Sequence, residues 1–153
     1  MKNLEELISE LESAIPHYQL INSTISTGSV GWHVEHTLLT LNLIIKELNK
    51  SNPKGYKWSF DIRRSFVLAV GKIPRGRVKA PSIVEPTIAF NEGTLQQHIA
   101  LSKQSLKTIA LLSPNNYFTH PFLGNFNLKP SVRFLKIHTN HHLKIINDII
   151  KNS

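Results

Sequence analysis

Apolar residues recur three and four positions apart in four long stretches of the chain, which is the spacing of one helix face. The first stretch covers residues 4–15, and Pro16 ends it. The second begins at a capping side chain, Ser29 or Thr27, and continues to about Lys50, where a Pro- and Gly-containing segment follows. Both stretches are long enough to be amphipathic helices that bury one face.

The other two stretches lie in the second half of the chain. One begins at a cap, Asn91 or Thr94, and reaches Leu112. The last has Pro130 in its first turn, where proline is well tolerated, and continues to about Ile150. The pattern therefore predicts four long helices.

The segments between these helices carry weaker signals. Residues 59–70 fit either a short helix or the end of a connection, and residues 51–59 and 72–91 are long, Pro- and Gly-punctuated connections. Two prolines weaken a strand signal at residues 83–90. Residues 114–127 are predicted to be a loop with several aromatic side chains. We therefore expect a single-domain, all-α fold over residues 1–153, a four-helix bundle with long connecting loops.

Composition narrows the function classes. The 153 residues contain no cysteine, which excludes disulfides, a thiol nucleophile and cysteine-ligated metal sites. No stretch approaches the roughly 20 apolar residues of a membrane span, and the acidic, periodic N-terminus does not resemble a signal peptide. We expect a soluble cytoplasmic protein without a membrane partner. The 18 basic residues against 10 acidic ones give a net charge of +8, which raises the question of an anionic or nucleic-acid partner.

Histidines supply the main candidate chemistry. His138 and His142 are four residues apart, so they share one helix face, and that face is the apolar stripe of the last predicted helix. His36 lies among apolar residues on the second predicted helix, and His33 shares a polar seam with it. Two imidazoles one turn apart, together with a third from a neighbouring helix, leave coordination positions open, as in catalytic metal sites. The alternative is a set of core histidines satisfied by hydrogen bonds.

Three motifs in order along the chain resemble the DinB-like superfamily of metal-binding four-helix bundles, which includes thiol S-transferases. They are a histidine within residues 31–38, the basic segment 71–81, and His120-Pro121-Phe122-Leu123-Gly124 followed by residues 138–143. The resemblance covers roughly residues 29 to 146. The second and third motifs are most similar to those of one uncharacterised subgroup of the superfamily.

The resemblance implies a ligand set of His36, His138 and His142, with His33 as the alternative ligand on the second helix. It implies a pocket role for His141. The subgroup usually has an acidic residue directly before the final histidine pair, and Asn140 stands there in this chain.

His120 and His141 are the candidate catalytic groups. His120 could act as an acid or base at the mouth of the site, because the ordinary pKa of histidine is near neutral. The alternative is an aromatic loop that packs over the end of the bundle, with His120 donating to a carbonyl.

The densest basic cluster consists of Lys72, Arg75, Arg77 and Lys79. These side chains could hold a carboxylate or phosphate of a substrate or thiol cofactor beside the metal. A solvated loop and a nucleic-acid patch are the alternatives. The chain has no recognised nucleic-acid-binding motif, and stacking aromatics do not alternate with the basic residues, so a nucleic-acid partner is disfavoured.

The resemblance implies a divalent metal, with zinc or nickel favoured over iron, and a metal-dependent thiol S-transferase or hydrolase acting on a small electrophilic or anionic substrate. Since the chain has no cysteine, a thiol would come from a low-molecular-weight cofactor such as bacillithiol, mycothiol or glutathione. The resemblance also implies a homodimer. The alternatives are a non-catalytic bundle that binds a metal or small ligand, and a basic DNA-associated stress protein.

Overall fold

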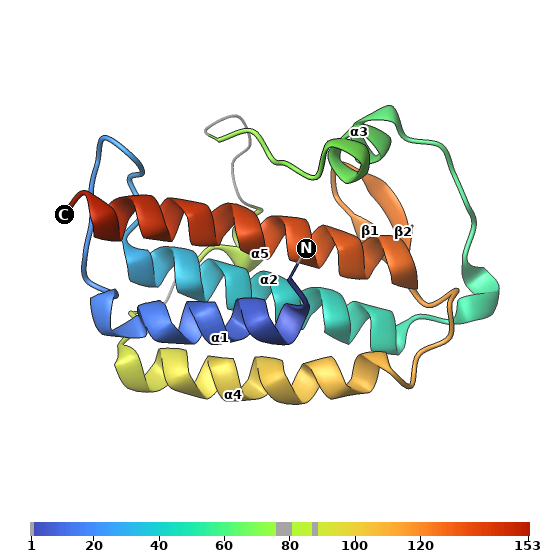
Figure 1. Ribbon diagram of the computed structural model, residues 1–153. Coiled ribbons are helices and arrows are strands. Elements are labelled where there is room, and N and C mark those ends of the chain that lie inside the picture. Colours follow the sequence, from blue (N-terminus) through green and yellow to red (C-terminus); the bar gives the residue numbers. More distant parts are fainter. Residues whose placement is uncertain (1, 76–80, 87–88) are drawn as a thin grey trace.

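The computed structural model describes residues 2–75, 81–86 and 89–153, and four long helices lie side by side in it (Figure 1). Helix α2 packs against α4 and α5, and α1 packs against the same two helices. Helices α1 and α5 run in one direction, and α2 and α4 run in the opposite one (Figure 1). The helices are α1 (Leu4–Ala14), α2 (Val30–Lys50), α3 (Ile62–Val70), α4 (Glu92–Ile109) and α5 (Leu128–Lys151).

Side-chain caps explain where most of these helices begin. Asn3, Ser29, Asp61 and Asn91 each accept a hydrogen bond from a backbone amide in the first turn of α1, α2, α3 and α4. The predicted caps Ser29 and Asn91 are thereby confirmed. Helix α3 confirms the short-helix interpretation of residues 59–70, and it ends at Gly71, whose φ of 66° is left-handed and suits glycine.

The predicted all-α four-helix bundle is wrong. The described part of the chain contains five α-helices and a two-stranded antiparallel sheet of β1 (Tyr117–His120) and β2 (Gly124–Asn127). These strands lie in residues that were expected to form a loop. The hairpin forms because Phe118 and Phe126 pair across it and stack with ring centroids 5.1 Å apart, both buried, while Gly124 turns the chain with a φ of 71°.

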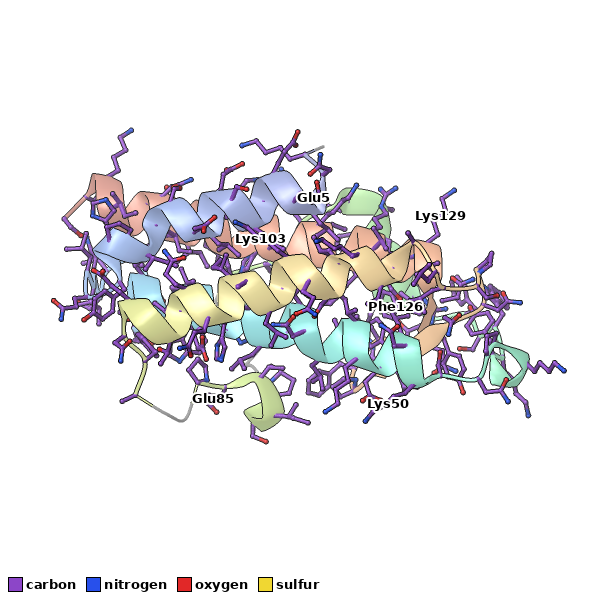
Figure 2. All side chains as sticks on the ribbon, turned by 90° about the horizontal axis from the view of Figure 1, so that it is seen from below. Glu5, Lys50, Glu85, Lys103, Phe126 and Lys129 are labelled. Atoms are coloured by element: carbon purple, nitrogen blue, oxygen red, sulfur yellow. The ribbon has the colours of Figure 1, made fainter. Side chains whose placement is uncertain are left out.

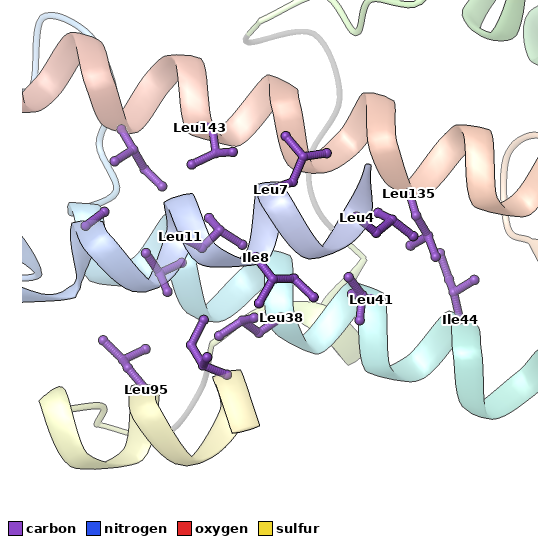
Figure 3. Close-up of a cluster of buried hydrophobic side chains, with 14 of the residues drawn as sticks. Leu4, Leu7, Ile8, Leu11, Leu38, Leu41, Ile44, Leu95, Leu135 and Leu143 are labelled. Carbon is purple, nitrogen blue, oxygen red and sulfur yellow. The ribbon is translucent and has the colours of Figure 1, made fainter. Parts of the chain in front are cut away.

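The core consists of the apolar stripes that the sequence predicts. Leucine and isoleucine side chains from all four long helices interdigitate between them (Figure 3). Charged residues such as Glu5, Lys50 and Lys129 extend from the outer faces, whereas Phe126 lies inside (Figure 2). Among the helices in the described ranges, none combines the length and the apolar character needed to cross a membrane.

Candidate metal centre

Helices α2 and α5 bring together the three histidines that the sequence singled out as metal ligands. His36 comes from the middle of α2, and His138 and His142 come from successive turns of α5. One ring nitrogen of each lies within 4.8 Å of the others, close enough for a metal ion. His36 and His142 are buried and His138 is partly buried. Because α2 and α5 are antiparallel neighbours, residues earlier on α2 lie beside residues later on α5.

The distance between two of these nitrogens suits a metal ion. His36 Nε2 and His138 Nε2 are 3.3 Å apart. In a tetrahedral zinc site with Zn–N bonds of about 2.0–2.1 Å, two ligand nitrogens lie about 3.3 Å apart. His36 Nδ1 donates to the carbonyl oxygen of Val84 at 2.8 Å, so the proton of this ring is on Nδ1 and its Nε2 lone pair faces His138. The donor set therefore fits a divalent metal.

His33 lies behind His142 and is not part of the triad. Its Nδ1 is 3.0 Å from His142 Nδ1, and its Nε2 is 2.9 Å from the Ser26 hydroxyl. If His142 Nδ1 donates to His33, His33 carries its proton on Nε2 and donates to Ser26, and His142 keeps a free Nε2 lone pair. The structure thus groups His36 with His138 and His142, and it places His33 against His142 from outside that group.

Burial keeps the cluster uncharged. The pKa values of His138 and His142 are well below the usual range, chiefly because burial disfavours the imidazolium, and neighbouring histidines lower them further. Burial also lowers the pKa of His36, against the opposing effect of its hydrogen bond to Val84. The pKa of His33 is lowered to about 4 by the same burial and by His36. Neutral imidazole is the form that binds metals.

Beside the cluster is a cavity of about 620 Å³. Its walls come from α2, α5, the β1–β2 hairpin and the segments around Ile73 and Val84. The three histidines of the cluster line it together with His33. Any metal held by the cluster would therefore be open to a small molecule in the cavity.

The two predicted catalytic histidines also line this cavity. His120 is at the end of β1, where its Nδ1 accepts the Phe122 amide at 3.1 Å, and burial lowers its pKa to about 4. Among the described residues, His120 donates to no carbonyl, as the alternative interpretation would require. His141 meets the His142 ring edge-on, with centroids 5.1 Å apart. Burial lowers the pKa of His141, and the nearby charge of Arg75 lowers it further.

Of the basic cluster, the structure describes Lys72 and Arg75, and only Arg75 lines the cavity. Lys72 is exposed and borders a separate hollow of about 250 Å³ that it shares with Lys144. Arg75 lines both spaces, and its guanidinium is 2.8 Å from the Asp148 carboxylate. Arg77 and Lys79 lie outside the described residues. Of the two described residues of the basic cluster, Arg75 is therefore the one that could hold an anion beside the candidate metal centre.

Sequence reasoning missed three contributors to the site. Trp32 stacks on His36, with ring centroids 5.1 Å apart and planes 12° from parallel; its position four residues before His36 was an available signal. The Val84 carbonyl, which fixes the tautomer of His36, and the Ser26 hydroxyl, which is hydrogen-bonded to His33, come from connections. Nothing in their local sequence marks them, because the contact depends on how the chain returns to α2.

Comparisons of the chain with protein-family models, with curated proteins and with solved structures gave no match. What identifies the candidate metal centre is thus its own geometry: three converging imidazoles, two of them with the opposite ring nitrogen already hydrogen-bonded, on the wall of a cavity.

Proposed function

We propose that this protein is a metal-dependent enzyme that activates a water molecule or a thiol for attack on a small electrophile, as a hydrolase or thiol S-transferase. His36, His138 and His142 hold the metal. The observation that carries the proposal is the convergence of these three neutral imidazoles beside a cavity large enough for a substrate. Three protein ligands leave positions for a nucleophile and a substrate, whereas a structural site is closed by four.

The metal is proposed to be zinc or nickel, with iron as the alternative, because an all-imidazole ligand set suits each of these ions. A bound divalent metal would supply Lewis acidity, which lowers the pKa of a water or thiol and polarises the electrophile. The resemblance to the DinB-like superfamily supports the same ligand set.

The other histidines of the cavity would position groups and accept protons. His33, anchored by Ser26, holds the ring of His142 in one orientation. His120 has a pKa lowered to about 4, so it is neutral at pH 7. Because its Nδ1 accepts the Phe122 amide, its proton is on Nε2, from which it can donate a hydrogen bond to a bound group. His141 borders both the cavity and His142 and is the candidate proton acceptor.

The test of the site is elemental analysis of protein purified without an affinity tag or metal column. We expect about one equivalent of metal per chain, lost in both His138→Ala and His142→Ala. His17→Ala is the matched control, because His17 is exposed and lies outside the cluster, and it should keep its metal. Unchanged metal content in the His138 and His142 variants would overturn the assignment.

The test of activity uses the metal-loaded protein with neutral aryl esters and aryl electrophiles, with and without a low-molecular-weight thiol. A metal-dependent rate without thiol supports a hydrolase, and a rate that requires thiol supports an S-transferase. If the protein binds stoichiometric metal but gives no rate with either substrate class, the proposal of an enzyme is wrong and the protein is a non-catalytic metal-binding protein.

A further inference from the structure

The walls of the cavity are mostly apolar. Four aromatic side chains contribute, from α2, β1, the hairpin turn and α5, and aliphatic side chains cover much of the remaining wall. The aromatic residues are Trp32, Phe118, Phe122 and Phe134. A pocket of this volume with such walls is typical of sites that enclose a drug-sized organic molecule.

Charge is almost absent from these walls. Among the lining residues in the part of the chain that the structure describes, only Glu47 and Arg75 carry a charge at pH 7 when the buried histidines are neutral. Arg75 is engaged by Asp148 at 2.8 Å, and Glu47 is 3.8 Å from Lys50. Both side chains are roughly half exposed, so they belong to the rim of the cavity.

In the metal-free protein, an anionic ligand would therefore lose hydration without gaining a free cation among the described lining residues, and burying an unpaired charge is strongly unfavourable. The polar groups that remain for a neutral ligand are the imidazole cluster and the hydroxyls of Ser23, Ser26, Thr27, Thr40 and Thr119.

We infer that the cavity binds an uncharged, ring-bearing organic molecule, whose apolar body packs against the aromatic wall and whose one polar end faces the histidine cluster. This inference rests on the proposed function in one respect: that the polar end of the ligand is the group that reacts. The packing of the apolar body depends on the cavity walls and does not require the metal. The expected substrates are thus neutral aryl electrophiles rather than phosphates or carboxylates.

The experiment compares two fluorescent probes with one skeleton, neutral N-phenyl-1-naphthylamine and its anionic analogue 8-anilino-1-naphthalenesulfonate, titrated into the protein as purified and into protein freed of metal by a chelator. We expect the neutral probe to bind the metal-free protein at least about tenfold more tightly than the sulfonate does, since one buried unpaired charge costs more than the 1.4 kcal/mol that corresponds to tenfold. Equal or tighter binding of the sulfonate would overturn the inference.

Two matched variants locate the probe. Phe122 lines the cavity and Leu101 on α4 does not, yet both are 49% exposed. Phe122→Glu should weaken the neutral probe about tenfold or more, and Leu101→Glu should leave it unchanged; equal effects would place the probe elsewhere and refute the inference. Leu43→Glu, inside the cavity, provides a second test if Phe122→Glu is poorly folded by circular dichroism.

Metal content measured on the same samples separates this inference from the proposed function. A neutral probe that binds, and responds to Phe122→Glu, in protein without metal would leave the cavity assignment standing and remove the metal enzyme. Stoichiometric metal together with no selective binding of the neutral probe would do the reverse.

Discussion

His33 shows how one residue outside the ligand set can control the site. It is 97% buried and makes two ring hydrogen bonds, to His142 and to Ser26, so its ring holds the ring of His142 in position. Residues that orient metal-bound histidines in this way typically contribute 10- to 100-fold to metal affinity.

We therefore predict that His33→Ala weakens zinc binding by about 10- to 100-fold while the stoichiometry stays at one. Competition with a chromophoric chelator measures the dissociation constant, and His17→Ala serves as the control. A complete loss of stoichiometric metal would instead make His33 a ligand, and an unchanged dissociation constant would show that His142 is oriented by other contacts.

His120 predicts a pH dependence of stability. Burial lowers its pKa from 6.5 to about 4, so between these pH values the unfolded chain binds a proton at this site that the folded chain does not. The contribution of His120 is therefore fully present above pH 6.5 and is lost as the pH falls toward 4. Compared with His120→Phe, the free energy of unfolding of the parent protein should decrease by about 2 kcal/mol more between pH 7 and 4.5.

Urea denaturation of the metal-free proteins at a series of pH values measures this difference. Phenylalanine is the suitable replacement because the His120 ring already contacts Phe122, Phe126 and Phe134. Parallel pH profiles for the two proteins would show that His120 is protonated as readily in the folded state as in the unfolded one.

At this scale, helical periodicity alone places His138 and His142 on a buried face and places His36 and His33 on a shared seam of another helix. Periodicity could not choose between His33 and His36, since they are one turn apart on the same helix; the resemblance implied the set of His36, His138 and His142. The choice depends on the carbonyl of Val84, which reaches His36 from a connection 48 residues away.

At the scale of elements, α3 is attached to the hairpin mainly through one buried cation. Arg64, whose side chain is the only buried one among the residues of α3, donates to the carbonyl oxygens of Ser59 and Asn125, the latter at 2.5 Å. Its guanidinium also lies 5.7 Å from the centre of the Phe126 ring. The planar, forked donor geometry of arginine suits several carbonyls at once.

We predict that Arg64→Ala lowers the free energy of unfolding by about 2–4 kcal/mol, because the carbonyls of Ser59 and Asn125 lose their charged donor and the space of a buried side chain is left empty. Arg64→Lys should recover little of it, since an ammonium cannot reach the carbonyls of Ser59 and Asn125 with the same fork. Arg63→Ala is the matched control: its side chain is 68% exposed, and the expected change is within about 0.5 kcal/mol. Equal effects at positions 63 and 64, measured by urea denaturation, would contradict this role.

Local patterns predicted the helices better than they predicted the hairpin. Caps and periodicity locate α1, α2, α4 and α5, whose signals extend over many residues. Strands β1 and β2 have four residues each, and Pro121 beside them favours a loop interpretation. Their pairing depends on Phe118 and Phe126 meeting each other and Phe134 of α5, which no local window contains.

For the whole molecule, a metal at the cluster would link two distant parts of the chain. A ligand that binds only the folded state stabilises it, by about 2.7 kcal/mol at a concentration 100 times its dissociation constant. We predict that chelation lowers the midpoint of thermal unfolding and that added zinc restores it. His138→Ala should show no difference between chelator and zinc; a midpoint shift that persists in this variant would place the stabilising metal elsewhere.

The arrangement of the long connections was the part of the whole that the sequence could least predict. The basic segment was expected to stand beside the metal as an anion clamp, yet Arg75 pairs with Asp148 and Lys72 borders a separate hollow. These positions depend on where α5 lies relative to residues 71–75, which is a tertiary contact. Charge counted along the chain therefore says little about charge at the cavity.

The antiparallel contact of α2 with α5 also has a consequence for how the protein would acquire the proposed metal. His36 and His138 are 102 residues apart in the chain, so the ligand set does not exist until a loop of that length has closed. A chain emerging from the ribosome would present His36 long before its partners and could hold metal only weakly there. Metal uptake should thus be a late event that reports completed folding, and cells that lack the ion should contain a folded but more easily degraded apoprotein.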